Sequence, residues 1–182
     1  MIEIRIDLPP NFESTMMRLA QIPGAMEKAA TRAIRRTLRG GRQDAARKIA
    51  QRYTIATGAV TKTIKLKVGG FQGEMSSRGS RHALKKFHIR PKKRPRIMPP
   101  GGVFVQNVRG QGGYLSHAFL GHNSGVVERV GTSRYPLRLL TGPASPQMLG
   151  SPAVGPFIEN KMYERMKINL DHEASAIING FA

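Results

Sequence analysis

The chain contains no cysteine and no tryptophan. The lack of cysteine excludes a disulfide scaffold, a thiol nucleophile and every cysteine-ligated zinc or iron–sulfur site. Seven Phe and four Tyr are too few, and too rarely interleaved with basic residues, to form stacking platforms for single-stranded nucleic acid. No helix-turn-helix spacing, zinc-finger ligand set or RNA-binding aromatic signature is present, so sequence-specific recognition of nucleic acid is not predicted.

Long apolar runs are also missing. The longest uncharged run, residues 139–158, contains four prolines, which would repeatedly break a membrane helix. Glu3, Arg5 and Asp7 interrupt the first eight residues, so we expect no signal peptide there. The sequence therefore predicts no transmembrane segment, and we expect no membrane among the partners.

Acidic residues are scarce, since eleven Asp and Glu stand against thirty Lys and Arg, for a formal net charge of +19. Such an excess repels itself in the folded state unless a polyanion or an acidic partner relieves it. Nucleic acid, an acidic protein surface and an anionic membrane would all supply the same Coulomb attraction. The charge therefore predicts a partner without identifying it.

The positive charge is concentrated in the middle of the chain. Between Met75 and Val127 there is no Asp or Glu, while ten Lys and Arg occur there. A second group lies on the polar side of a predicted helix. We predict that both groups form an interaction surface for nucleic-acid backbone or a strongly acidic protein wall, with a merely solvated face as the alternative. The predicted basic surface consists of Arg32, Arg35, Arg36, Arg39, Arg78, Arg81, Lys85, Lys86, Arg90, Lys92, Lys93, Arg94 and Arg96.

Apolar residues at helical spacing predict a long helix over residues 24–53. Ile34 and Leu38 lie on its apolar face, and arginines occupy the opposite face over its first half. Gly40 and Gly41 lie in the middle of this pattern, where each costs about 1 kcal/mol relative to Ala. They predict either a kink or the close approach of another backbone to Gly41.

Short strands separated by glycine-rich turns are predicted for the middle of the chain. A Pro/Gly-rich arm at about residues 141–156 then leads to a final helix over residues 157–179. The sequence predicts one α+β domain, residues 1–182, in which a long N-terminal helix and a C-terminal helix flank an antiparallel β-sheet or partly closed barrel. Its basic, β-rich middle spans about residues 64–140. The candidate strands are residues 1–8, 64–68, 71–76, 83–90, 103–108, 114–120, 126–130 and 137–140.

Residues that could carry catalysis are few and scattered, and no nucleophile lies in a recognisable elbow or glycine-rich cradle. His117 and His122 with Glu128, or His82 with His88, could in principle bind a metal, but neither spacing matches a known site. We therefore predict no catalytic residue, no metal and no cofactor. A hydrolase or nuclease ranks last among the function classes, because a nuclease needs clustered carboxylates for its metal ions.

Three motifs follow one another in residues 118–149. A Gly-His turn at residues 121–122 precedes a Gly-x-Ser-Arg-x-Pro-Leu segment at residues 131–137 and a Gly-Pro-(small)-x-Pro-Gln-Met segment at residues 142–148. Together with the arginine-, glycine- and alanine-rich helix upstream, these motifs resemble the minor tail protein Z family of bacteriophages. The motif residues with a predicted role are Arg134, Pro136, Gly142, Pro143, Pro146, Gln147 and Met148.

The resemblance implies a structural, non-enzymatic tail-completion protein. It would act at the head-proximal neck of the virion tail, late in tail assembly, so that the tail can join the filled head. The implied partners are the tail terminator, the tail tube and the connector, and the implied assembly is a homo-hexameric ring. The resemblance also implies localisation in the virion, and in the host cytoplasm during assembly.

Two alternatives stay open from the sequence. Residues 142–148 are either an arm that contacts neighbouring subunits or an ordered loop that closes the core before the last helix. The basic surface meets either genomic DNA or acidic protein. A free-standing basic protein that binds nucleic acid without sequence preference is the alternative function, because the charge alone suffices for it.

Overall fold

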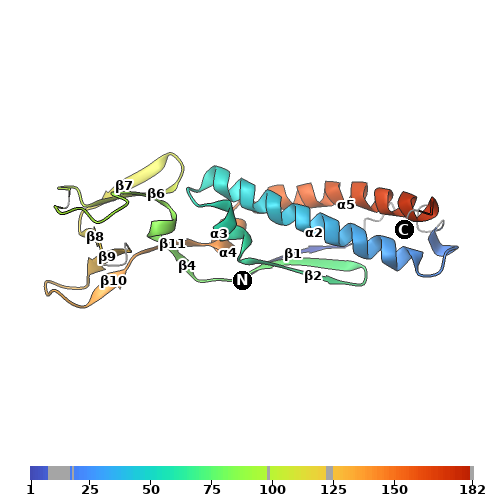
Figure 1. Ribbon diagram of the computed structural model, residues 1–182, viewed down its shortest axis with the longest axis horizontal. Helices are drawn as coiled ribbons and strands as arrows, with labels where there is room; N and C mark the ends of the chain where they lie inside the picture. The colour runs from blue at the N-terminus through green and yellow to red at the C-terminus, as the bar shows by residue number, and fades with distance from the viewer. Residues whose placement is uncertain (8–16, 18, 98, 122–124, 181–182) are drawn as a thin grey trace.

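The computed structural model describes residues 1–7, 17, 19–97, 99–121 and 125–180. Figure 1 shows an elongated molecule with a pair of long helices over a small sheet at one end and two further sheets at the other end. We call these ends the helical lobe and the β-lobe. In chain order the elements are β1 (Ile2–Ile6), α2 (Ala25–Arg52), α3 (Thr57–Thr61), β2 (Ile64–Gly69), β3 (Gln72–Ser77), β4 (Arg81–Ala83), the 3-10 turn η2 (Leu84–Lys86), β5 (His88–Arg90), β6 (Val103–Val108), β7 (Gln111–Leu115), β8 (Ala118–Leu120), β9 (Val126–Arg129), β10 (Leu137–Leu139), β11 (Thr141–Ala144), α4 (Ser145–Leu149) and α5 (Gly155–Ile178).

The two long helices pack side by side and antiparallel. The Arg36 guanidinium binds Glu173 at one end of the pair, and Lys48 lies over the Phe157 ring at the other end. Their apolar stripes are buried, as the helical spacing predicts. The stripe residues are Ile34, Leu38 and Ile49 of α2 and Met162 and Ile177 of α5.

Helix α2 continues unbroken through Gly40 and Gly41. A Cβ on Gly41 would lie 2.6 Å from Sδ of Met162, and a Cβ on Gly40 would overlap the Arg165 side chain. The glycines therefore accommodate two side chains of α5, and neither a kink nor a close backbone contact explains them.

The helical lobe contains the antiparallel sheet β1-β3-β2. Ile4, Ile64 and Met75 are buried on the face toward the helices, whereas Arg5 and Lys65 on the other face are exposed. A Cβ on Gly73 of β3 would overlap the Ile34 side chain, which shows that α2 packs directly on this strand. The helices thus cover one face of the sheet and do not flank it from two sides (Figure 1).

The β-lobe contains the sheets β5-β6-β7 and β8-β9-β10, both antiparallel. The chain enters it through β4 and leaves through β11, and these two strands pair with each other, with Thr141 opposite Ala83. The Leu84 amide also donates to the Leu140 carbonyl. The entry and the exit of the β-lobe therefore lie side by side.

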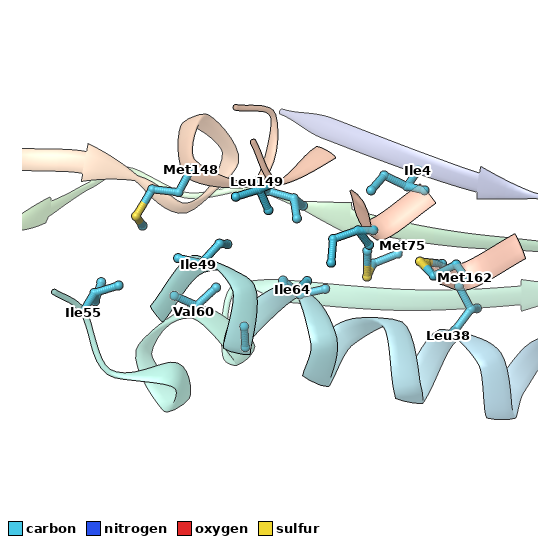
Figure 2. Packing of buried hydrophobic residues seen from close by; sticks show 14 of the residues in the cluster. Ile4, Leu38, Ile49, Ile55, Val60, Ile64, Met75, Met148, Leu149 and Met162 are labelled. Atoms are coloured by element: carbon cyan, nitrogen blue, oxygen red, sulfur yellow. The ribbon is translucent and has the colours of Figure 1, made fainter. Parts of the chain in front are cut away.

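Helix α4, directly after β11, returns the chain to the helical lobe. Met148 and Leu149 are fully buried, and Figure 2 shows both of them on the side of α4 that faces Ile49 of α2. The Gln147 carboxamide oxygen accepts a hydrogen bond from the Ala144 amide at 2.9 Å, which closes the first turn of this short helix.

Several predicted features are corrected by the structure. The first long helix is not N-terminal, because β1 precedes it and the helix begins at Ala25. None of the sheets among the described residues closes into a barrel. The strand predicted at residues 83–90 is divided by η2, and the strand predicted at residues 114–120 is divided into β7 and β8. Within the Pro/Gly-rich segment, residues 141–149 form β11 and α4.

Candidate interaction surface

All residues of the predicted basic surface are exposed. Among the described residues, Arg36 is the one member with an acidic partner, since its guanidinium lies 3.0 Å from Glu173. The other cations of the surface therefore keep their charge uncompensated by neighbouring carboxylates. This arrangement raises the local positive potential and favours a polyanionic or acidic partner.

The surface is divided between the two lobes. Arg32, Arg35, Arg36 and Arg39 lie on the exposed side of α2, whereas most of the remaining cations lie in η2, β5 and the loop after β5. Helix α2 meets the β-lobe at its last turn, where the Arg109 amide donates to the Arg52 carbonyl at 2.8 Å. At a rise of about 1.5 Å per residue, Arg32 is about 30 Å from this junction. The structure therefore does not bring the two groups into one compact patch.

Two further arginines lie between these groups. Arg47 continues the exposed side of α2 at a spacing of eight residues from Arg39, and a shallow open cleft at the junction is lined by Arg47 and Arg109. Arg109 is held there because its Nε donates to the Ala50 carbonyl at 3.0 Å. The helical spacing could have placed Arg47 on the arginine side of α2, but the position of Arg109 beside the same cleft depends on tertiary structure.

The family-motif residues fall in two places. Arg134 and Pro136 are exposed in the connection between β9 and β10, where the Arg134 guanidinium lies 5.7 Å from the centre of the Tyr135 ring. Gly142 is buried, and a Cβ there would lie 2.6 Å from the Phe87 ring. Pro143 lies in β11 and Pro146, Gln147 and Met148 lie in α4. Of these, Met148 is buried, the two prolines are half-buried and Gln147 is exposed.

Of the histidines considered as metal ligands, His82, His88 and His117 lie within the described residues. No group of three or more His, Asp or Glu side chains that could hold a metal ion occurs within the described residues. Glu128 binds the Arg138 guanidinium, His117 is exposed, and His122 lies outside the described residues. The structure also contains a buried pair that the sequence does not indicate. Nε2 of His82 lies 2.7 Å from Oγ of Ser145.

The His82–Ser145 pair has the atoms of a nucleophile and a base but not their setting. Both residues are almost inaccessible to solvent. Nδ1 of His82 faces the Lys86 ammonium at 3.4 Å, where a catalytic histidine would have a carboxylate. Burial, and secondarily the charge of Lys86, lower the pKa of His82 below 6.5. This geometry supports a neutral histidine whose hydrogen bond to Ser145 connects β4 to α4.

In the described part of the chain, no helix is both long enough and apolar enough to cross a bilayer. In comparisons with known proteins, no family model, no curated protein and no solved structure matches the chain.

Proposed function

We propose that the chain is a structural component of the head-proximal end of a bacteriophage tail, of the minor tail protein Z type, which supports tail assembly and head–tail joining. The observation that carries the proposal is the exposed and largely uncompensated basic surface of the β-lobe. The motifs of residues 121–148 support the same role by their resemblance to that family.

A ring of such subunits would multiply the effect of the basic surface. Each copy would present the same exposed cations around the central passage, so that the potentials of neighbouring copies add. Arg47 and Arg109 extend the positive charge from the β-lobe toward α2, which suits a long partner such as duplex DNA or the acidic wall of a tail tube, terminator or connector.

The alternative is a free-standing basic protein that binds nucleic acid without sequence preference. The same exposed cations favour it, because phosphate contacts position a protein without reading the bases. The two functions differ in their consequences. A tail component enters assembled tails, whereas a free-standing protein binds DNA and stays outside the virion.

The test is charge reversal with a matched control. One variant changes Lys85, Lys86, Lys92, Lys93 and Arg94 to Glu. The control changes the exposed Lys62, Lys65, Lys67, Lys161 and Lys167 of the helical lobe to Glu. We would measure incorporation into purified tails, and binding to duplex DNA and to purified tail tubes across a salt series.

We expect the first variant to lose incorporation and salt-dependent binding while staying folded, and the control to lose much less. A first variant that assembles and binds like the wild type at every salt concentration would show that the surface is only solvated. Salt-dependent binding of the wild type to DNA, without its incorporation into tails, would favour the alternative function.

A further inference from the structure

The outer face of the β8-β9-β10 sheet is apolar and lacks a covering element within the described chain. Phe119, Val127 and Leu139 stand opposite one another across the three strands, and Leu137 stands opposite Arg129. Leu139 is 53% exposed. We call this surface the lobe face: Phe119, Val127, Arg129, Leu137 and Leu139, with Val130, Arg134 and Tyr135 in the adjoining connection.

The two faces of this sheet carry different charged residues. Ala118, Leu120 and Val126 are buried on the inner side, where Glu128 binds Arg138. On the lobe face the charged residues are arginines, and the Arg129 guanidinium lies over the Phe119 ring at 5.9 Å. Exposed apolar and aromatic residues beside arginine are typical of the centre of a protein–protein interface.

A second exposed apolar surface lies on α5. Ile168 is 69% exposed and Phe157 is 42% exposed, and the exposed acids Glu164 and Asp171 lie on the same side. At 100° per residue these four residues fall within about 60° of arc, so they form one ridge on the helix. We call them the α5 ridge. The helix carries four acidic and three basic residues. Lys161 lies 3.6 Å from Glu164 and Lys48 of α2 lies over the Phe157 ring, while Asp171 has no ion pair among the described residues. Ion pairs on an exposed surface are weak, so both carboxylates of the ridge can still bind a cationic partner.

The two surfaces cannot meet within one molecule. The lobe face belongs to the β-lobe, while α5 runs along the helical lobe toward the opposite end of the long axis (Figure 1). Both expose apolar residues, and the arginines of the lobe face are opposite in charge to the carboxylates of Glu164 and Asp171. We propose that the lobe face of one copy binds the α5 ridge of a second copy of this chain, with Arg129 and Arg134 opposite Glu164 and Asp171.

This contact is heterologous, because it joins different surfaces of identical chains. Repeated from copy to copy, it closes into a ring or continues as a filament, depending on the rotation at each step. The inference rests on the proposed function in one respect, because it identifies the contact through which copies of the tail component would meet. The surfaces themselves follow from the exposed residues and their charges.

The experiment is sedimentation velocity of the purified full chain over a concentration series. We would work at about 0.15 M salt, where the Debye length of about 8 Å screens the repulsion between two strongly basic molecules. The lobe-face variant combines Arg129→Glu with Leu139→Ser. The ridge variant combines Glu164→Lys with Ile168→Ser, and the control combines Lys65→Glu with Phe71→Ser, both exposed outside the two surfaces. Circular dichroism checks that each variant is folded.

We expect the wild type and the control to associate, and each of the other variants to raise the dissociation constant at least about tenfold. A mixture of the two variants should form a 1:1 dimer and nothing larger, because the ridge of the lobe-face variant and the lobe face of the ridge variant are both intact. A symmetric contact would not show this rescue.

A wild type that stays monomeric up to about 100 µM, or oligomers that survive either variant, would overturn the inference. A mixture without rescue would overturn the heterologous pairing. Because the measurement uses the purified chain alone, its outcome is separate from the proposed function. If copies of the chain associate but the protein is absent from tails, only the tail role is refuted. If the protein enters tails but its copies do not associate through these surfaces, only this contact is refuted.

Discussion

His82 and Ser145 are joined by a buried hydrogen bond of 2.7 Å that connects β4 to the first turn of α4. The Lys86 ammonium has only donors, so Nδ1 of His82 accepts from it, and the ring proton is on Nε2 and is donated to Ser145. The neutral imidazole can therefore form hydrogen bonds with both Lys86 and Ser145. A protonated ring could not accept from Lys86 and would place a buried imidazolium beside the Lys86 ammonium.

The protein should therefore lose stability as the pH falls through the range in which histidine side chains titrate. The pKa of His82 is below 6.5 in the folded state because of burial and the charge of Lys86. The unfolded chain consequently binds the proton more readily, and stability that is present above about pH 6.5 is lost as the pH falls toward the folded-state pKa. Thermal unfolding of wild type and His82→Gln between pH 8 and pH 5 tests this.

We expect the melting temperature of the wild type to fall more steeply with acidification than that of His82→Gln. His117→Gln, which changes an exposed histidine, is the control and should keep the wild-type slope. Equal slopes for wild type and His82→Gln would show that this histidine does not couple protonation to folding.

Gly41→Ala should destabilise the fold although alanine favours a helix. The new Cβ would lie 2.6 Å from the sulfur of the buried Met162, so this side chain or α5 must shift, and overpacking of this kind costs about 1–3 kcal/mol. Gly58→Ala in α3 is the matched control, since nothing lies within 4 Å of its Cβ, and it should be neutral or stabilising by up to about 1 kcal/mol. Urea unfolding measures both. A stabilising Gly41→Ala would contradict the packing described for α2 and α5.

Arg165 should not be interchangeable with the other cations of α5. Its guanidinium binds Asp44 of α2 at 2.5 Å and its side chain lies over Gly40. Arg165→Glu would place a carboxylate against Asp44 and should cost about 1–3 kcal/mol, whereas Lys167→Glu on the exposed side should change stability by no more than about 0.5 kcal/mol. Similar unfolding free energies for the two variants would show that the ion pair is not formed in solution.

The two groups of the basic surface should act independently on a polyanion. Changing Arg32, Arg35 and Arg39 to Glu, or changing Lys92, Lys93 and Arg94 to Glu, should each lower the slope of log K against log salt by about three, provided that each cation contacts a phosphate. The binding free energies lost by the two variants should add up in the combined variant, because the three arginines of α2 lie about 20–30 Å along the helix from its junction with the β-lobe. Strong non-additivity in DNA binding would place the two groups in one compact site.

The helices could be predicted because their apolar stripes are regular. Helix α2 occupies Ala25–Arg52 where residues 24–53 were predicted, and α5 occupies Gly155–Ile178 where residues 157–179 were predicted. The role of Gly41 could not be predicted, because it depends on Met162, which is far away in sequence. The exposure of the basic surface followed from composition, since charged residues are rarely buried without partners.

The arrangement of the β-lobe was less predictable. Residues 83–90 are predicted as one strand, but only residues 87–90 alternate. The chain makes a 3-10 turn at Leu84–Lys86, and Phe87 packs against Gly142. The lobe face was missed because β9 and β10 have apolar residues on their outer side, so alternation could not distinguish inside from outside. The bond between His82 and Ser145 joins residues with no spacing signal between them.

The adjacent entry and exit of the β-lobe have an evolutionary consequence. Residues 84–140 begin and end at one point, where the Leu84 amide donates to the Leu140 carbonyl, so the β-lobe has the connectivity of an insertion between two paired strands. Insertions with neighbouring ends can be lengthened, shortened or exchanged while the host domain keeps its chain path. The helical lobe can thus persist as a scaffold while the segment with the exposed cations of η2, β5 and the loop after β5 diverges to suit each new partner.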